Sequence, residues 1–541
     1  MCGIQVNINL KGVNKHNFEK SLKEIIHRGP NNQASYFSDD GTIALGSTRL
    51  SIQDLSDSAN MPLEIGNKVI VYNGEIYNFK EIRSELQLIG IEFKTSSDTE
   101  VLLRGYNYYG SNIFKKLRGM FALVIFDKTK KKIICARDRS GEKPMYLFKN
   151  NSELFICSEL TQIFKNTDYK FNIDKSSLCD FFANGYVNNH STLIKEIKKF
   201  KAGYFEEISI NKGFNCLNLE KFFEDPKPKI SNSKKEEIAN KLDNLLDNSV
   251  KNQMSSDVPL GVLLSGGIDS SLISYYAQKN SLNKIKTFHV SFNGDSKLNE
   301  SVYAKKVSEF LGTEHIEIDG NEISYDTLDQ LSKSLDHPIG DSSLIPTFLV
   351  SKLTKKYVTV ALGGDGGDEL FGGYTTYQKI IQENTFLKNI PEFIFEIQKR
   401  VTANVFPVGY RGRSFLMGLS NDMNKRFNTN RIFDAPSINK LINIDYCNKN
   451  KFVNNNNSDF IFNATWNDYN NYLREDILVK VDRMSMANSL ELRAPFLDPK
   501  IIDFAFNEVS SNLKVNKNEL KIIPKFLANK LYENNINFDR K

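Results

Sequence analysis

A run of serines, glycines and one aspartate at residues 265–271 has the residue types that phosphate chemistry requires. It follows an apolar run, residues 260–264, typical of a buried strand, and it precedes a helical pattern. A strand, a glycine turn and a helix N-terminus direct free backbone N–H groups at one spot, which suits an anion. Asp269 would repel a bare phosphate, so its presence predicts a metal ion between its carboxylate and the phosphate oxygens. An ordinary strand-to-helix turn is the alternative, but such a turn does not require the whole Ser-Gly-Gly-x-Asp-Ser-Ser string.

A second glycine cluster, residues 363–374, follows another apolar run at residues 358–362. It places three acids among six glycines. A flexible loop is the alternative interpretation. Three carboxylates after a buried strand suit a metal ion and a pyrophosphate better than they suit a linker.

The first residues of the chain are Met1-Cys2-Gly3-Ile4. Most lone cysteines are small buried hydrophobic residues. If Met1 is removed, however, Cys2 carries both a thiol and a free α-amine. That amine has a usual pKa of about 8, so it can act as a general base for the thiol. The position of Cys2 therefore predicts a nucleophile.

Composition indicates a multidomain globular protein, because 541 residues exceed what one hydrophobic core holds. The net charge of +6 comes from 71 basic and 65 acidic residues, which predicts no nucleic-acid partner. No apolar run reaches the roughly 20 residues of a membrane span, and we expect no signal peptide. Six cysteines without a Cys-x-x-Cys pair argue against disulfides or a zinc site. We expect a cytoplasmic enzyme acting on small molecules; whether it is a homodimer stays open.

Two prolines, Pro226 and Pro228, interrupt regular structure and divide the chain. The predicted domains are residues 1–210 and 236–541, joined by a linker at 211–235. In the second domain apolar strands alternate with amphipathic helices, which is typical of a parallel sheet with its ligands at the carboxyl ends of the strands. Strands are predicted at residues 259–264, 285–292, 314–318 and 357–362.

Residues 265–271 resemble the PP-loop of ATP pyrophosphatases, which cleave ATP between the α and β phosphates; the chain has no Walker A loop. Behind Cys2 follow His-Arg-Gly-Pro, Arg-Leu-Ser-Ile-Gln, Tyr-Asn-Gly-Glu and Ser-Asp-Thr-Glu, the order found in class II glutamine amidotransferases. From Cys2 to Asp498 the combination resembles the glutamine-hydrolysing asparagine synthetase family. The resemblance implies an α/β and α+β fold: an N-terminal-nucleophile αββα sandwich, then a Rossmann-like PP-loop domain.

The resemblance implies roles for the residues of the first site. Cys2 attacks the glutamine side-chain amide and forms a thioester, while Asn73 and the Gly74 N–H hold the oxyanion. Arg49 binds the substrate α-carboxylate and Asp98 the α-ammonium, since a zwitterion needs one cation and one anion at a fixed separation. Taken singly, Asn73-Gly74 is typical of a hairpin turn and residues 97–100 of a helix cap. The residues implied to bind glutamine are Arg49, Leu50, Ser51, Ile52, Gln53, Asn73, Gly74, Glu75 and Asp98.

At the second site the resemblance implies that Asp269 and Asp368 hold Mg²⁺. Asp365, where the family often has glutamate, assists formation of the acyl-adenylate or deprotonates the incoming ammonia. The residues implied to bind ATP are Leu263, Ser265, Gly266, Gly267, Asp269, Ser270, Val290, Gly363 and Gly364.

The sequence departs from the family at its end. The family carries a Lys-x-Gly-Phe-like motif on a loop over the ATP, and by alignment Lys541, the last residue, takes the place of its lysine. A terminal lysine is poorly ordered by default. Pro524 also falls inside the helical pattern of residues 520–531. We expect either a truncated chain or a weakened synthetase step.

The leading hypothesis is ATP-dependent amidation of aspartate with ammonia from glutamine, through β-aspartyl-AMP. Two alternatives stay open, because the acceptor pocket has no recognisable motif. One is the same chemistry on another carboxylate, such as a sugar acid or a peptide. The other is a binding or regulatory protein that has lost turnover through its short C-terminus.

Overall fold

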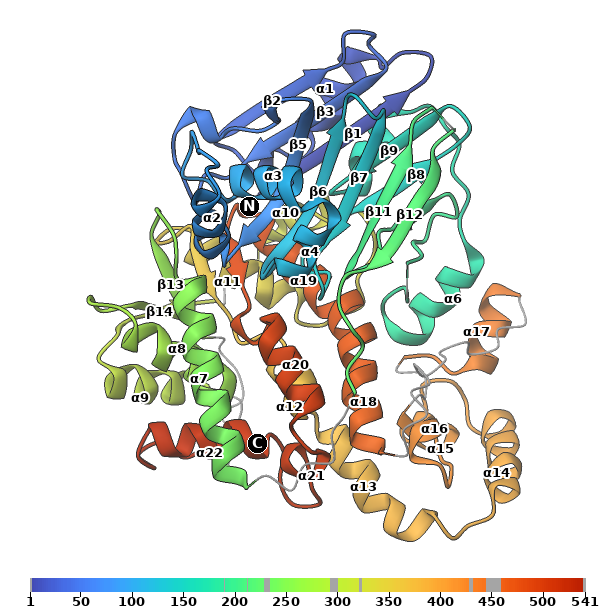
Figure 1. Cartoon of the computed structure of the whole chain (residues 1–541). Coiled ribbons are helices and arrows are strands. Elements are labelled where there is room, and N and C mark those ends of the chain that lie inside the picture. Colours follow the sequence, from blue (N-terminus) through green and yellow to red (C-terminus); the bar gives the residue numbers. More distant parts are fainter. Residues whose placement is uncertain are drawn as a thin grey trace.

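The computed structural model describes residues 2–188, 190–211, 213–227, 234–291, 300–320, 324–427, 432–443 and 459–538. Lys541, predicted at the pyrophosphate, lies outside the described residues, as do Cys447 and residues 292–299. The N-terminal region forms two stacked sheets, and the C-terminal region is a third sheet surrounded by helices (Figure 1).

Two antiparallel sheets build the N-terminal region among the described residues. The first has the spatial order β10 (Ile197–Lys199), β8 (Tyr146–Lys149), β9 (Glu153–Cys157), β1 (Cys2–Asn9), β3 (Ile43–Arg49) and β2 (Asn32–Phe37). The second has the order β12 (Asn215–Lys221), β11 (Tyr204–Ser209), β7 (Lys132–Arg137), β6 (Gly119–Asp127), β5 (Lys68–Ile76) and β4 (Leu63–Ile65). Strand β12 lies within the stretch predicted as a linker.

Alternation of side chains explains why these sheets stack. Ile4, Val6 and Ile8 of β1 are fully buried and share one core with Val69 and Val71 of β5. Helices cover the outer faces, with Phe18 and Leu22 of α1 packing on the first sheet. The αββα prediction is confirmed. The helices of this region are α1 (Lys15–Lys23), α2 (Phe79–Leu88), α3 (Asp98–Tyr109), α4 (Ile113–Lys116), α5 (Leu160–Asn166) and α6 (Lys175–Asn184).

The C-terminal region contains a parallel sheet, as predicted. Its order is β15 (Glu314–Asp319), β14 (Lys286–Ser291), β13 (Leu260–Leu263), β16 (Val360–Leu362) and β17 (Glu491–Arg493). The four predicted strands are present with slightly different ends. Strand β17 was not predicted, because only Leu492 is apolar and its charged neighbours pair with each other: Arg493 Nε lies 2.6 Å from Glu491 Oε1.

Helices surround this sheet (Figure 1). The first one, α7 (Lys235–Gln253), is amphipathic, as predicted for the helices of this region, and buries Ile238, Leu242, Leu246 and Val250. The others around the sheet are α8 (Ile268–Lys279), α9 (Ser301–Leu311), α10 (Tyr325–Lys333), α11 (Leu344–Thr354), α12 (Gly367–Phe371), α18 (Phe460–Asp468), a π-helix (Tyr469–Ile477), α19 (Leu478–Met486), α20 (Pro499–Asn507), α21 (Ser511–Lys514) and α22 (Ile522–Leu531). A further group comprises α13 (Thr375–Leu387), α14 (Glu392–Val405), α15 (Arg413–Met417), α16 (Met423–Phe427) and α17 (Ala435–Ile442).

Two expectations about the chain as a whole can be compared with the described residues. Each described cysteine (Cys2, Cys135, Cys157, Cys179 and Cys216) has a free thiol. No helix in the described ranges is both long and apolar enough to cross a membrane.

Candidate functional site

Cys2 lies at the start of β1 and is only 6% exposed. Antiparallel pairing with β3 sets it opposite Arg49. Its backbone N donates a hydrogen bond of 3.1 Å to Asn73 Oδ1 on β5. The other end of that amide, Asn73 Nδ2, is buried and has no partner among the described residues. An unoccupied N–H donor therefore lies beside the cysteine, as an oxyanion would require.

Electrostatics at Cys2 favour the protonated thiol. Burial raises its pKa above the usual value, and the charge of Arg49 with a backbone hydrogen bond from Leu50 opposes only part of the shift. Because the thiolate is the nucleophile, such a site needs a base to remove the proton.

Arg49 holds the loop that follows β3. Its Nη1 donates to Ser56 O (3.1 Å) and Asn60 Oδ1 (2.8 Å), and its Nη2 to Gln53 O (3.1 Å) and Asp54 O (2.5 Å). These contacts use the four terminal N–H groups of the guanidinium. Binding of a substrate carboxylate by Arg49 therefore requires the Nε–H or an exchange of one of these contacts.

The predicted glutamine-binding segment, residues 50–53, lies where the two regions meet. Leu50 and Ile52 are buried in one apolar cluster with Val360 and Met486 of the C-terminal region. The carbonyl of Ile52 accepts a hydrogen bond of 2.9 Å from Asp257 N. Residues 50–53 therefore contact both the N-terminal and the C-terminal region.

Asp98 and Glu75 lie at the carboxyl end of β5. Asp98 Oδ2 accepts hydrogen bonds from Tyr72 Oη (2.8 Å) and Ile76 N (3.0 Å). It is the first residue of α3, which Ser97 caps, so the helix-cap interpretation of residues 97–100 is also correct. Burial and the charge of Glu491 raise the pKa of Glu75, and Arg493 Nη2 lies 3.6 Å from Glu75 Oε2.

Gly74 is inside β5 and not in a hairpin turn. Its φ of +155° and its closeness to β6 exclude a side chain: an added Cβ would lie 2.0 Å from Met120 O. We therefore expect Gly74→Ala to destabilise the protein by about 3 kcal/mol or more and to impair glutamine hydrolysis. Urea unfolding and a glutaminase assay measure both effects.

Gly90→Ala is the matched control, since Gly90 also has a positive φ (+86°) but has no atom within 4 Å of an added Cβ. Its cost should be about 1–2 kcal/mol, from the backbone alone. Equal losses in the two variants would show that the close contact with β6 does not matter.

At the second site, the loop after β13 is held by hydrogen bonds to its own serine hydroxyls. Ser265 N donates to Ser270 Oγ (3.2 Å), the two hydroxyls are 3.0 Å apart, and Gly267 N donates to Ser265 Oγ (3.2 Å). Gly266 has a φ of +76°, and a Cβ there would lie 2.5 Å from Ala304 N. The strand, turn and helix predicted from residues 260–276 are confirmed.

Asp269 is packed against the second glycine cluster. A Cβ on Gly367 would lie 2.5 Å from Asp269 Cγ, and one on Gly364 would lie 2.9 Å from Asp269 Cβ, so only glycine allows this approach. Asp269 Oδ1 is buried without a hydrogen-bond partner in the described residues. Burial raises the pKa of Asp269 to about 6, with Lys521 opposing the shift.

Lys521 is the residue of this site that the sequence analysis missed. Its Nζ pairs with Asp269 and lies 2.7 Å from Asp368 Oδ1. Burial lowers the pKa of Lys521, but the two carboxylates outweigh it and raise the pKa above its usual value. Pro524 is tolerated because α22 begins at Ile522, which places the proline in the first turn, where its missing N–H is not needed.

These residues surround a cavity of about 460 Å³ at the carboxyl ends of β13, β14 and β16. Burial raises the pKa of Asp365 on its wall, and Lys480 opposes this. Of the residues predicted to bind ATP or metal, Gly266 lines a neighbouring cavity of about 340 Å³ that shares Lys521. The remainder line the larger cavity: Leu263, Ser265, Gly267, Asp269, Ser270, Val290, Gly363, Gly364 and Asp368.

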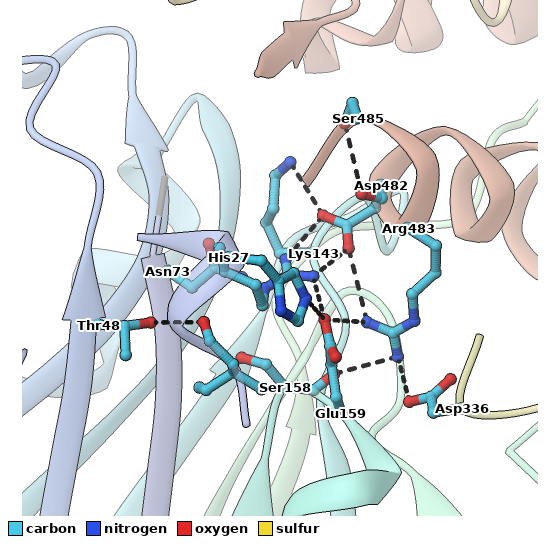
Figure 2. Close-up of polar contacts among 12 residues, drawn as sticks. His27, Thr48, Asn73, Lys143, Ser158, Glu159, Asp336, Asp482, Arg483 and Ser485 are labelled. Carbon is cyan, nitrogen blue, oxygen red and sulfur yellow. Dashed lines mark hydrogen bonds and ion pairs between the residues drawn. The ribbon is translucent and has the colours of Figure 1, made fainter. Parts of the chain in front are cut away.

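A buried network of charges connects the first site to the C-terminal region (Figure 2). Arg28 Nε donates to the Cys2 carbonyl (3.3 Å), and its Nη1 lies 2.8 Å from Asp482 Oδ2 on α19. Asp482 also lies 3.5 Å from Lys143 Nζ. Arg483 joins Glu159 (3.3 Å) to Asp336 (2.8 Å), as Figure 2 shows. Helix α19 is thus fixed to the strand that carries Cys2.

Removal of Asp482 should be strongly destabilising. Asp482→Ala leaves Lys143 buried without its counter-charge and leaves Arg28 with Glu159 alone, and an uncompensated buried charge typically costs about 3–5 kcal/mol. Urea unfolding measures this cost. The control is Asp503→Ala, which also breaks an ion pair between the regions (Arg139 Nη2–Asp503 Oδ1, 2.7 Å) but whose side chain is 51% exposed. It should cost about 1 kcal/mol or less, and a similar loss in both variants would contradict the importance of burial.

Comparison with known proteins bears on both sites. The asparagine synthase family model matches residues 241–541, and the glutamine amidotransferase domain model matches residues 1–218. An asparagine synthetase [glutamine-hydrolyzing] 1 from Bacillus subtilis (strain 168) is 35% identical over 510 residues, or 92% of this chain and 79% of the relative. The chain belongs to the asparagine synthase family.

Other relatives of this asparagine synthase family member carry similar names. A putative asparagine synthetase [glutamine-hydrolyzing] 2 from Methanocaldococcus jannaschii is 36% identical over 435 residues, covering 75% of this chain and 81% of the relative. A putative asparagine synthetase [glutamine-hydrolyzing] from Mycobacterium bovis is 31% identical over 527 residues, covering 92% of this chain and 78% of the relative. The family resemblance stated from the motifs is confirmed, and the protein is an enzyme with a glutamine amidotransferase domain and an asparagine synthase domain.

Proposed function

We propose that this enzyme makes asparagine from aspartate, with ATP as the activating substrate and glutamine as the nitrogen donor. The observation that carries the proposal is the convergence of Asp269 and Asp368 on one cation, Lys521, above the Ser-Gly-Gly loop. Two carboxylates and a lysine next to backbone N–H groups suit a metal-bound pyrophosphate. Family membership supports the same chemistry.

In the glutaminase reaction, Cys2 attacks the side-chain amide of glutamine. The α-amine set free when Met1 is removed takes the thiol proton and passes it to the departing ammonia. Asn73 Nδ2, which has no other partner in the described residues, donates to the developing oxyanion together with the Gly74 N–H. Water then hydrolyses the glutamyl thioester on Cys2 and releases glutamate.

In the synthetase reaction, the aspartate β-carboxylate attacks the α-phosphate of ATP, and ammonia then displaces AMP from β-aspartyl-AMP. The N-terminus of α8, which begins at Ile268 directly after the Ser-Gly-Gly loop, offers backbone N–H groups to the phosphates. Lys521 stabilises the leaving pyrophosphate. Asp365, whose pKa is raised by burial, accepts the proton that the attacking ammonia loses.

Asp269 and Asp368 would hold Mg²⁺. The buried Asp269 Oδ1, unpaired in the described residues, fits a metal ligand. No cage of three or more His, Cys, Asp or Glu side chains occurs in the described ranges, which suits Mg²⁺, because it usually binds one or two carboxylates plus substrate phosphates. The ion would neutralise phosphate charge.

The experiment that tests the proposal identifies both the acceptor and the products. Purified enzyme is given ATP, Mg²⁺ and glutamine labelled with ¹⁵N in the side-chain amide, with aspartate or with a sugar acid or peptide carboxylate. We expect labelled asparagine, AMP and pyrophosphate only with aspartate. Formation of ADP and phosphate, or faster turnover of another carboxylate, would overturn the proposal.

A further inference from the structure

A small cavity lies between the two sites. Its volume is about 20 Å³, and its wall includes Glu142 from the N-terminal region and Asp365, Val481, Leu492 and Arg493 from the C-terminal region. A space of this size holds one molecule as small as water or ammonia and excludes larger ligands. The size of the cavity thus limits what can occupy it.

The cavity borders both sites through residues already described. Asp365 lines this cavity and also the 460 Å³ cavity at the Ser-Gly-Gly loop. Arg493 lines it on the other side and lies 3.6 Å from Glu75, next to Gly74 and Asn73. A molecule that moves from Cys2 to Asp365 by this route passes Glu142.

Glu142 is an acidic residue of this wall that has no role in either proposed reaction. It lies between Gly141 and Lys143 in the loop after β7, is partly buried, lines the cavity, and makes no hydrogen bond or ion pair through its carboxyl within the described ranges. The charged groups nearest to it have partners of their own. Asp138 accepts from the Glu142 and Lys143 backbone, and Lys143 pairs with Asp482.

The surroundings of Glu142 favour its neutral acid. Burial raises its pKa well above the usual value, the carboxylates Asp138, Asp365 and Asp498 add to the shift, and Lys143 opposes it. The hydroxyl of Tyr77 is also buried and has no partner among described residues; burial raises its pKa, and the charge of an ionised Glu142 would raise it further. A neutral carboxyl offers an O–H donor, and the nitrogen of ammonia is a good acceptor.

We propose that Glu142 is the residue that binds ammonia in transit between the two sites, through a hydrogen bond from its carboxyl to the ammonia nitrogen in the 20 Å³ cavity. This rests on the proposed function, in which ammonia from Cys2 is used at Asp365. Leu478, Val481, Leu492 and Ala494 supply the apolar part of the wall. Lys143, Asp482, Ser485 and Arg493 also line the cavity, and each has a partner of its own: Lys143 and Asp482 pair with each other, Ser485 donates to the Asp482 carbonyl, and Arg493 pairs with Glu491.

The test compares Glu142→Leu and Glu142→Gln with the unaltered enzyme. The readout is asparagine formed per glutamine hydrolysed, with ATP, Mg²⁺, aspartate and ¹⁵N-amide glutamine in the presence of unlabelled ammonium. Loss of one neutral hydrogen bond predicts a fall of about threefold to tenfold in Glu142→Leu. Glu142→Gln keeps the shape and an N–H donor, so its loss should be smaller.

Partial reactions separate this role from a structural one. Glutamine hydrolysis, aspartate-dependent exchange of pyrophosphate into ATP, and synthesis from saturating ammonium should each stay within about twofold in both variants, because none needs ammonia to cross the cavity. Parallel loss in all of these reactions, or unchanged coupling in Glu142→Leu, would overturn the proposal.

Glu153→Gln is the matched control. Glu153 is a buried glutamate whose pKa is also raised by burial, but it accepts a hydrogen bond from Asn7 and is not part of the cavity wall. It should leave the coupling ratio unchanged, and a fall in this variant as well would overturn a specific role for Glu142. If the unaltered enzyme forms no asparagine from glutamine, the proposed function fails, whatever the variants do.

Discussion

Replacement of Cys2 by alanine should abolish glutamine hydrolysis and leave synthesis from added ammonia intact. Loss of the attacking atom of a covalent mechanism typically lowers the rate by roughly 10⁴–10⁶-fold. The synthetase residues lie elsewhere, at the carboxyl ends of β13 and β16, so they keep their geometry. The measurements are glutamate release from glutamine and asparagine formation from ammonium chloride, on the same preparation.

The control for this variant is Cys135→Ala. Cys135 is fully buried in the core between the two sheets, so its replacement removes a thiol and leaves a small void without touching the site. Cys135→Ala should lose stability and keep glutamine hydrolysis. Retention of Met1 on the purified, active enzyme would contradict the role given to the α-amine, and residual hydrolysis in Cys2→Ala would contradict the nucleophile.

Local patterns explain why much of the fold was predictable from the sequence. An apolar run followed by Ser-Gly-Gly predicts a strand, a turn and a helix, because each of these choices depends on neighbouring residues. The same holds for Ser97 at the start of α3 and for the apolar face of α7. A parallel sheet then brings the loops after β13 and β16 to the same edge, so Asp269 and Asp368 were predicted to meet.

Contacts between distant segments could not be read in this way. Lys521 is 252 residues from Asp269, and Arg28 is 454 residues from Asp482. No periodicity records such pairs, since both members look like ordinary charged residues of a helix or a loop. Glu142 is a similar case: only the docking of the two regions places it on the wall of a cavity. Asn73-Gly74 misled the local interpretation because a hairpin signal lies inside a buried strand.

The second large effect is expected at Lys521. Lys521→Met should lower aspartate-dependent exchange of pyrophosphate into ATP by about 10²–10³-fold, as does loss of a group that stabilises developing charge in a buried site. Glutamine hydrolysis should be nearly unchanged, because its residues lie in the N-terminal region. Lys530→Met is the control: Lys530 lies near the end of α22, the helix that Lys521 immediately precedes, is exposed, and donates a hydrogen bond from its ammonium to Asn240.

Asp368→Ala distinguishes two possible roles of Lys521: balancing the charge of the carboxylates and acting directly on the pyrophosphate. If Lys521 only balances the charge of Asp269 and Asp368, removal of one carboxylate should make the lysine partly dispensable. The double variant, Lys521→Met with Asp368→Ala, should then exchange pyrophosphate at the same rate as Asp368→Ala alone. If Lys521 acts on the pyrophosphate, the two losses should add, because metal binding and direct charge stabilisation are separate contributions. We expect the losses to add. The lysine bridges the carboxylates here because the three groups converge on the place where a metal-bound pyrophosphate would lie.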